Sequence, residues 1–268
     1  MSSIQVLAVQ KKVWPAPADN YASVKGMLEA YSGDRPDFIL LPEIFTCPYE
    51  NSCFPVFAQK DGGEAFSFLS ELARDRNCYV VGGSVPEIDE EGKLYNTSYI
   101  FDRSGGLIGK HRKIHLFDID VPGGQYFKES DVLTAGDQVT VFDTEHGKMG
   151  VCICFDIRFP ELFLKMREMG VRIVFVPAAF NMTTGPAHWE VLFRSRAIDQ
   201  QIFMMGCSPA RDTSASYVVY GHSILVNPWG RVLKELDEKE GLLSTRIDLD
   251  QTDAVRQQIP LRKGNSQE

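Results

Sequence analysis

The chain lacks the features that would assign it to a membrane, to nucleic acid or to the cell exterior. No uninterrupted apolar run reaches the ~18 residues that a membrane-spanning helix needs. Its 28 Lys and Arg residues are outnumbered by 36 Asp and Glu, and this net charge of −8 disfavours a phosphate backbone or an anionic lipid surface as a partner. Residues 1–10 are too short and too uncharged for a signal peptide. We therefore expect a cytoplasmic protein whose partner is neither a nucleic acid nor a membrane.

Motifs for metal binding and for several other chemistries are also missing. The six cysteines form no CxxC pair, and the sequence contains no HExxH, GxSxG or GxxxxGK[ST] motif. Cys152 and Cys154 lie two residues apart on an expected strand, which cannot bring them into disulfide geometry. Because the chain is long and shows no export signal, we expect free thiols, no metal site and no cofactor.

Short apolar segments alternate with segments of helical spacing along the chain. The pattern β-α-β-α-β-β occurs roughly twice, which predicts an α/β protein with helices outside two packed sheets. With 268 residues and no low-complexity linker, we predict a single domain over residues 1–263 and a disordered tail at residues 264–268. The expected strands are 4–9, 38–41, 78–85, 94–101, 107–108, 139–143, 148–155, 172–176, 202–207, 222–227, 232–236 and 242–247, and the expected helices are 18–31, 64–76, 159–169 and 187–201.

Residues 150–162 carry a cysteine out of a buried strand, through a polar turn and into a helix. Cys154 stands at the expected end of the strand, and Pro160 is typical of a first helical turn. Catalytic groups collect at such strand ends, so we interpret Cys154 as a reactive thiol and Cys152 as a core residue. The alternative is that both are small core hydrophobes, which is the usual role of a free cysteine.

Two other segments place ionisable side chains among apolar residues. Glu43 follows the strand 38–41 and lies between Pro42 and Ile44, which favours a buried carboxylate over a solvated helix-start charge. Apolar residues interleave with the basic residues of segment 110–120, so we expect at least one of these cations to point inward instead of forming a solvated face. The basic residues are Lys110, His111, Arg112, Lys113 and His115.

A cysteine hydrolase needs a thiolate, a proton carrier and a group that stabilises the oxyanion of the tetrahedral intermediate. Most such enzymes use histidine as the proton carrier. The five histidines, at positions 111, 115, 146, 188 and 222, leave a Cys–His pair open on composition alone.

Three blocks of the sequence resemble, in order, the signature blocks of the nitrilase superfamily of carbon-nitrogen hydrolases. They are Leu-Pro-Glu at 41–43, His-Arg-Lys-Ile-His-Leu-Phe at 111–117 and Cys-Phe-Asp-Ile-Arg-Phe-Pro-Glu-Leu at 154–162. The resemblance implies a four-layer α-β-β-α sandwich that forms a homodimer or a higher homo-oligomer. It also implies a catalytic set of Glu43, Lys113 and Cys154, supported by a second glutamate, Glu129.

The implied roles suit these residue types. Cys154 would attack an amide carbon, while Glu43 takes the thiol proton and returns it to the leaving ammonia. Lys113 and the Phe155 backbone amide would stabilise the oxyanion, and Lys113 would also favour the thiolate. Water activated by Glu43 would then hydrolyse the thioester. Glu129 would orient Lys113, unless it is an ordinary surface charge. The family commonly has tyrosine at the position of Phe155, but the main-chain donor does not depend on that hydroxyl.

Within the superfamily, segments 115–123, 180–190 and 208–212 most resemble the omega-amidases. This implies hydrolysis of the terminal amide of 2-oxoglutaramate and 2-oxosuccinamate. The free carboxylate of such a substrate requires a cation besides Lys113, and Arg158 and Arg211 are the candidates. Arg158 has the alternative role of bracing Asp156 and Glu161. We also expect a pocket wall with polar donors from Phe180, Asn181 and Thr184.

Other functions stay open on the sequence. An amidase for deaminated glutathione is the nearest alternative, followed by another amidase of the superfamily, a true nitrilase or a carbamoyl-amide hydrolase. A catalytically inactive binding or scaffold protein that retains the fold belongs to a different class, and the complete set of reactive residues argues against it. We expect His188 and Trp189 to pack or cap a helix, and the turn at 227–230 to be structural with an aromatic anchor.

Overall fold

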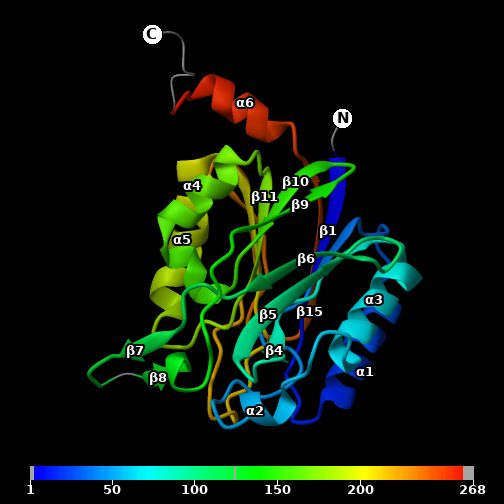
Figure 1. Cartoon of the computed structure of the whole chain (residues 1–268). Coiled ribbons are helices and arrows are strands. Elements are labelled where there is room, and N and C mark those ends of the chain that lie inside the picture. The colour runs from blue at the N-terminus through cyan, green and yellow to red at the C-terminus, as the bar shows by residue number, and fades with distance from the viewer. Residues whose placement is uncertain (1–2, 124, 262–268) are drawn as a thin grey trace.

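The computed structural model describes residues 3–123 and 125–261. The tail expected at residues 264–268 lies outside the described residues. Two mixed β-sheets form the centre of the molecule, and helices cover the outer face of each sheet (Figure 1).

The first sheet has seven strands. Along its path lie β15 (Gly241–Asp248), β1 (Ser3–Gln10), β2 (Phe38–Leu40), β3 (Tyr79–Val81), β5 (Leu94–Phe101) and β4 (Val85–Ile88), and β6 (Leu107–Arg112) pairs with β5. Strands β1, β2 and β3 are mutually parallel. Their carboxyl ends therefore meet at one edge of the sheet.

The second sheet repeats this arrangement with six strands. Its order is β14 (Val232–Glu235), β13 (Ile224–Val226), β12 (Phe203–Cys207), β11 (Ile173–Pro177), β10 (Gly147–Val151) and β9 (Thr140–Thr144). Strands β10, β11 and β12 are parallel, so this sheet too has a shared edge of carboxyl ends. A separate hairpin pairs β7 (Asp118–Asp120) with β8 (Tyr126–Lys128).

Helices α1 (Pro17–Glu29) and α3 (Glu64–Arg76) lie on the first sheet, and α4 (Pro160–Glu168) and α5 (Gly185–Gln200) lie on the second (Figure 1). The predicted four-layer α-β-β-α sandwich is therefore confirmed. The remaining helices are short: α2 (Phe54–Phe57), α6 (Gln251–Gln258) and two 3₁₀ segments, Glu129–Asp131 and Cys154–Arg158. Of the helices that the structure describes, none is both long and apolar enough to cross a membrane.

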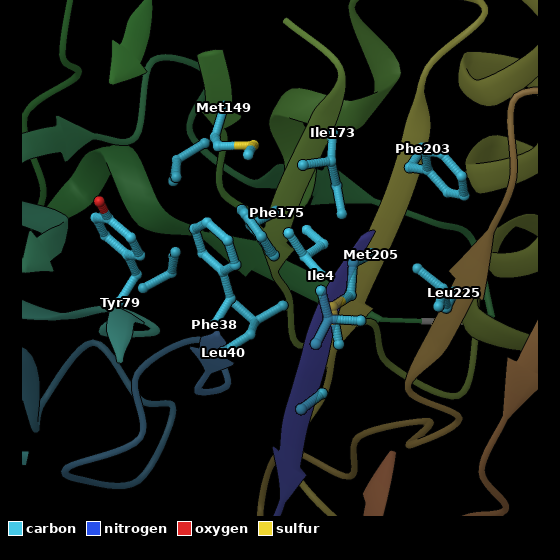
Figure 2. Close-up of a cluster of buried hydrophobic side chains, with 14 of the residues drawn as sticks. Ile4, Phe38, Leu40, Tyr79, Met149, Ile173, Phe175, Phe203, Met205 and Leu225 are labelled. Carbon is cyan, nitrogen blue, oxygen red and sulfur yellow. The ribbon is translucent and has the colours of Figure 1, made fainter. Parts of the chain in front are cut away.

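Buried side chains fill the space between the two sheets (Figure 2). The Phe38 ring of β2 stacks on the Phe175 ring of β11 with their centroids 5.3 Å apart. Along β1, Ile4 and Val6 enter this central cluster, whereas Leu7 packs toward the helices. Both faces of the inner strands are thus buried, which explains why these strands are continuously apolar in sequence.

Most predicted elements are present, but several boundaries differ: the strand expected at 107–108 extends to Arg112, and two further differences affect the site. The strand expected at 78–85 is divided, because β3 ends at Val81 and Gly82 and Gly83 turn the chain before β4. Gly83 has φ +58°, and a Cβ at this position would collide with the Pro42 carbonyl oxygen. Only glycine allows this approach, which presses the end of β3 against the loop after β2.

The strand expected at 148–155 ends at Val151, before the cysteine of interest. Cys154 is instead the first residue of a 3₁₀ helix and has a left-handed φ of +47°. Cys152 and Cys154 consequently do not share a strand face. The β7–β8 hairpin, α2 and α6 were not predicted.

Candidate active site

Glu43, Lys113 and Cys154 come together at the carboxyl ends of strands from the two sheets. We call these three residues the reaction centre. Glu43 follows β2, Lys113 follows β6 and Cys154 follows β10. Lys113 Nζ lies 2.9 Å from Glu43 Oε1, and both groups interact electrostatically with the Cys154 thiol. Glu43 and Lys113 are fully buried and Cys154 is 4% exposed. Three residues far apart in sequence therefore form one solvent-shielded cluster.

Backbone strain positions two of these side chains. Cys154 has φ +47°, and Ile44, next to Glu43, has φ +46°. A positive φ is a true outlier for a β-branched residue and costs on the order of 1–3 kcal/mol. Ile44 is held in this conformation by Ser84, whose Oγ accepts a hydrogen bond from the Ile44 amide at 2.9 Å. Such strain persists only where the surrounding structure enforces it, and here it aims Glu43 and Cys154 at each other.

Glu129 completes the environment of Lys113. Lys113 Nζ lies 2.9 Å from Glu129 Oε2, and the Phe117 amide donates to that oxygen at 2.6 Å. Glu129 is fully buried, so the alternative of an ordinary surface charge is wrong. The ammonium group is therefore held between two carboxylates.

Tyr49 and Asn96 were missed by the sequence analysis. Tyr49 OH donates to Glu129 Oε1 at 2.6 Å and lies 3.2 Å from Glu43 Oε1. Asn96 Nδ2 donates to Glu43 Oε1 at 2.9 Å, and the Lys113 amide donates to the Asn96 carbonyl at 2.9 Å. These contacts occupy Oε1 of Glu43. Its buried Oε2 has no hydrogen-bond partner, and the carboxylate also interacts with the Cys154 side chain.

The electrostatics of the reaction centre keep the resting thiol protonated. Burial raises the pKa of Cys154 well above its usual range, and the Glu43 carboxylate adds to the rise. Lys113 lowers the pKa of the thiol as predicted, but burial outweighs it. Burial also raises the pKa of Glu43, against the attraction of Lys113, which makes Glu43 a stronger base than an exposed carboxylate. A protonated thiol needs a base beside it before it can attack, and Glu43 is the carboxylate that interacts with it.

Lys113 remains a cation in this setting. Burial alone would lower its pKa, but Glu129 and Glu43 outweigh burial and raise it above the usual value. A permanent positive charge beside the thiol suits the stabilisation of a developing oxyanion.

Asp156 fastens the turn that carries Cys154. Its carboxylate is fully buried and accepts hydrogen bonds from the Ile153 amide at 2.9 Å and the His115 amide at 2.9 Å. The His111 and His115 side chains also contact it, at 3.1 and 2.8 Å. Burial would raise the pKa of Asp156, but these hydrogen bonds lower it far below its usual value. The two histidines of the basic segment therefore support the turn through Asp156.

The other three histidines also have partners other than the thiol. His188 contacts Arg158, His222 lies 3.4 Å from Glu235, and His146 lies 3.3 Å from Glu145. Within the part of the chain that the structure describes, Cys154 therefore has a carboxylate and not a histidine beside it. The Cys–His alternative is not supported by this geometry.

Arg158 does not take the alternative role of bracing Asp156 and Glu161. Its guanidinium lies over the Phe155 and Phe180 rings, 5.4 and 5.1 Å from their centroids, and Nη1 contacts His188 Nδ1 at 3.2 Å. It forms no ion pair with Asp156 or Glu161 among the described residues, and its buried Nε has no hydrogen-bond partner. Burial lowers the pKa of Arg158, and interaction with Cys154 raises it in part. Arg158 is therefore a cation near the thiol whose Nε–H donor has no acceptor among the described residues.

Arg211 instead donates hydrogen bonds to the backbone of its own loop. Its Nε and Nη2 donate to the carbonyls of Val219 and Tyr220, at 3.3 and 2.7 Å. The carbonyls satisfy this guanidinium and fix the loop, so Arg158 is the better candidate for a substrate carboxylate.

The segment after β11 forms a wall close to the reaction centre. Phe180 packs edge-on against Trp189, and its neighbour Asn181 is 1% exposed. Asn181 Oδ1 accepts hydrogen bonds from the amide and hydroxyl of Thr184 at 2.9 and 3.0 Å. Thr184 therefore orients Asn181, and the Asn181 Nδ2 group remains as a buried donor without a partner.

A cavity of about 690 Å³ opens beneath this wall, and we call it the hairpin cavity. Its lining includes residues 125–127 on the β8 side of the hairpin, the Met182 and Thr183 pair next to Asn181, and residues 49–51 and 216–218. It offers a route along which a substrate can approach the Asn181 segment.

The structure supports the expected structural role of Trp189 but not that of Trp229. Trp189 is buried and its Nε1 donates to the His222 carbonyl at 2.7 Å, which confirms a packing role. Trp229 is 56% exposed, so it does not anchor its turn as expected. The turn is held instead by Asn227, whose Oδ1 accepts from the Arg231 amide at 2.9 Å.

No group of three or more His, Cys, Asp or Glu side chains in the described ranges 3–123 and 125–261 has the arrangement of a metal site. All six cysteines are free thiols, as predicted.

Several known proteins are similar to this chain in sequence and in fold. A family model described as carbon-nitrogen hydrolase matches residues 5–257. Omega-amidase NIT2-A of Xenopus laevis is 46% identical over 263 residues, which cover 98% of this chain and 95% of that protein. Omega-amidase NIT2 of Homo sapiens is 44% identical over 261 residues, covering 97% and 94%. The crystal structure of Saccharomyces cerevisiae Nit3, a member of branch 10 of the nitrilase superfamily, matches with a TM-score of 0.88 and 39% identity, covering 97% of this chain and 96% of that chain.

Proposed function

The chain belongs to the carbon-nitrogen hydrolase family and is an amidase, and from this premise we propose that it acts as an omega-amidase. In this proposal it hydrolyses the terminal amide of 2-oxoglutaramate and 2-oxosuccinamate to the 2-oxo dicarboxylate and ammonia. The observation that carries the chemistry is the buried cluster in which Lys113 lies between Glu43 and Glu129 beside Cys154.

The first half-reaction forms a thioester. Glu43 Oε2 takes the proton of the Cys154 thiol as the sulfur attacks the amide carbon. The carbonyl oxygen becomes an oxyanion, and Lys113 Nζ and the Phe155 amide stabilise it. The Phe155 amide lies in the first turn of the 3₁₀ helix that begins at Cys154, where amides lack intrahelical acceptors and are available to an anion. Collapse of this intermediate breaks the C–N bond, and Glu43 gives its proton to the leaving nitrogen.

The second half-reaction hydrolyses the thioester. Water gives a proton to Glu43 as its oxygen attacks the thioester carbon, and the same oxyanion site holds the new intermediate. The C–S bond then breaks, the acid leaves, and the sulfur recovers the proton from Glu43. Glu43 thus carries a proton in each direction in both halves, which fits its raised pKa. Glu129 and Tyr49 keep Lys113 and Glu43 in place throughout.

Arg158 supports a substrate with a carboxylate at the far end from the amide. Its guanidinium lies on two aromatic rings near Cys154 and has no carboxylate partner among the described residues. Arginine binds a carboxylate through two parallel hydrogen bonds, which would fix the acyl chain relative to the thiol. The Asn181 Nδ2 donor lies on the same wall and suits the 2-oxo group.

The test compares kcat/KM for ammonia release from 2-oxoglutaramate, deaminated glutathione and a simple nitrile. The proposal predicts the highest kcat/KM for 2-oxoglutaramate. It also predicts that Arg158→Met raises KM for that substrate by about 10- to 100-fold, because a charge-assisted bidentate contact is lost, with little change for a short amide that has no carboxylate. A kcat/KM for deaminated glutathione or for the nitrile that equals or exceeds that for 2-oxoglutaramate would refute the omega-amidase assignment.

A further inference from the structure

A lysine without a carboxylate partner is buried behind the loop that carries Glu43. Lys11, the residue that follows β1, is fully buried. Its Nζ donates to Asn20 Oδ1 at 2.6 Å and to the Phe45 carbonyl at 3.3 Å. Within residues 3–123 and 125–261 it forms no ion pair with an Asp or Glu side chain. A buried ammonium group without a carboxylate is costly to a fold, which makes Lys11 a candidate for a functional role.

Asn20 connects Lys11 to three loops. Its side chain, on α1, is fully buried, and Nδ2 donates to the carbonyls of Trp14 and Thr46 at 2.7 and 3.0 Å. The Lys11 carbonyl accepts a hydrogen bond from the Ala210 amide at 2.9 Å. These bonds join the loop after β1, the loop after β2 and the loop after β12. Lys11 and Asn20 therefore form a buried polar pair that holds the three loops together.

The Phe45 carbonyl that Lys11 holds lies directly after the strained turn of the base. Ile44, between Glu43 and Phe45, has φ +46°. Ser84 accepts hydrogen bonds from the Ile44 amide through Oγ at 2.9 Å and from the Phe45 amide through its carbonyl at 3.1 Å. A strained conformation persists only where its surroundings enforce it. Phe45 is thus held at its amide by Ser84 and at its carbonyl by Lys11.

We propose that Lys11 is a positioning residue for Glu43 and that its ammonium form, by holding the Phe45 carbonyl, keeps the base directed at the thiol. The inference rests on the proposed role of Glu43 as the base. Lys11 does not line the cavity of about 460 Å³ to which Glu43 contributes, so it acts through the backbone of the loop and not on the substrate.

The charge of Lys11 changes near neutral pH. Burial lowers the pKa of Lys11 to about 7, against the attraction of Glu240 and Cys207. Those two are the titratable groups that face it, from the segment before β15 and from β12, whereas α1 presents the Asn20 amide and the loop after β2 a carbonyl. Burial raises the pKa of Cys207 to about 12, so this thiol stays neutral. Because an ammonium group makes stronger hydrogen bonds than a neutral amine, the hold on Phe45 weakens as pH rises through about 7.

The experiment measures kcat and KM of the wild type and of Lys11→Met between about pH 5.5 and 9. Methionine is unbranched and of similar length, and it removes a costly buried charge, so the variant should fold. Its kcat should be about tenfold below wild type at pH 6, through loss of a charge-assisted hydrogen bond, and about threefold or less below it above pH 8. KM should stay within about twofold, because no contact with the substrate is lost. The matched control is Lys25→Met on the exposed side of α1, which should follow the wild type at every pH.

Urea unfolding tests the titration of Lys11 independently of turnover. Its pKa is about 7 in the folded protein and about 10.4 in an unfolded chain, so the unfolded state binds more protons between these values. The wild type should therefore gain stability relative to Lys11→Met as pH rises from about 7 to 10. A stability difference that stays constant over this range would show that Lys11 does not titrate there and would overturn the proposal.

Two kinetic results would also overturn the proposal. One is a wild-type kcat in Lys11→Met, and the other is a kcat deficit that is equal at pH 6 and pH 9, because loss of packing alone does not depend on pH. The assay uses any amide that the wild type hydrolyses, so it does not depend on the omega-amidase assignment. An inactive Glu43→Gln protein together with a pH-independent deficit in Lys11→Met refutes the role of Lys11 alone. An active Glu43→Gln protein refutes the base and this inference with it.

Discussion

At the scale of single residues, Lys113 has to compensate two fully buried carboxylates. Its Nζ lies 2.9 Å from both Glu43 and Glu129. Without this cation, the two carboxylates would repel each other in a medium of low polarity. A buried charge that loses its partner is strongly destabilising, whereas an exposed pair contributes little. In the proposed mechanism, catalysis and folding therefore depend on the same ammonium group.

We expect Lys113→Met to abolish ammonia release and to lower the free energy of unfolding by about 3–5 kcal/mol, because it leaves uncompensated buried charge. Denaturant unfolding and an ammonia assay measure the two effects. Lys148→Met is the control, since Lys148 is half-exposed on β10 and lies 3.4 Å from the exposed Asp143. A Lys113→Met protein with wild-type turnover would remove Lys113 from the oxyanion site.

His188 contacts Arg158, the residue proposed to bind the substrate carboxylate. Its Nδ1 lies 3.2 Å from Arg158 Nη1, and accepting that hydrogen bond requires a neutral imidazole. Burial and the neighbouring Arg158 both lower the pKa of His188, which favours the neutral form at pH 7. His188 is thus a positioning residue in this account.

We expect His188→Ala to raise KM for 2-oxoglutaramate by about 3- to 10-fold through loss of one hydrogen bond, with kcat nearly unchanged. The KM of a short amide without a carboxylate should not move, and this comparison separates positioning of Arg158 from a general structural effect. If a folded His188→Ala protein lost kcat by orders of magnitude, a Cys–His mechanism would replace the present one.

At the scale of elements, the 3₁₀ helix that presents Cys154 depends on a single carboxylate. Asp156 caps the turn through the Ile153 amide and ties it to β6 through His111 and to the segment after β6 through His115. Because its pKa is depressed in the folded protein, this stabilisation is complete above the unfolded-state pKa of about 3.9 and is lost as pH falls below that value.

We expect Asp156→Asn to lower the free energy of unfolding at pH 6 by about 3 kcal/mol and to reduce kcat by misplacing the thiol. The stability difference from wild type should shrink as pH falls from about 4 toward 2. Circular dichroism of urea unfolding at each pH measures this difference. Asp143→Asn, at a side chain that is 80% exposed, should show no such trend. A difference that is constant with pH would show that the Asp156 charge is not what stabilises the turn.

The sequence predicts helices and strands well where their residues are continuously buried. It predicts them poorly where backbone geometry sets the ends of an element. Helix α3 has the predicted bounds, and the inner strands follow their apolar runs. The division after Val81 could not be predicted, because it depends on contact between Gly83 and the loop of Glu43, 40 residues away. The β7–β8 hairpin and α6 were missed because polar residues dominate them.

The residues of the candidate site likewise divide into those that the sequence predicts and those that it does not. The resemblance of three sequence blocks to signature blocks of the superfamily predicted that Glu43, Lys113 and Cys154 belong to one site, because each residue occurs in its own block. Tyr49 and Asn96 are residue types of ordinary appearance, and their roles arise from contacts 80 and 53 positions away along the chain. The partner of Arg158 could not be predicted either, because it depends on a helix-borne His188 that packs beside it only in the folded protein.

At the scale of the whole molecule, an exposed apolar strip lies along α5. Val191 and Ile198 are seven residues apart, so they share one face of the helix, and they are 61% and 47% exposed. Gly230 lies against Ile198, which places the 56% exposed Trp229 at the end of the strip. Apolar residues grouped in this way mark association surfaces.

We expect the protein to be a homodimer or a higher homo-oligomer, and Ile198→Glu to weaken its association by burying a charge in the apolar contact. Light scattering coupled to size exclusion measures the mass of each form. Val56→Glu is the control, because Val56 is 74% exposed on α2, away from this strip. A wild type that is monomeric at micromolar concentration would contradict the assignment of this face.

The central claim is that Cys154 carries the acyl group of an omega-amide as a thioester. The direct measurement is mass spectrometry of the protein quenched in acid within milliseconds of mixing with 2-oxoglutaramate, followed by peptide mapping. The account predicts an acyl adduct on Cys154, none on the buried Cys152, and no adduct in Cys154→Ala. Release of ammonia by the Cys154→Ala protein, or an adduct on any other residue, would contradict it.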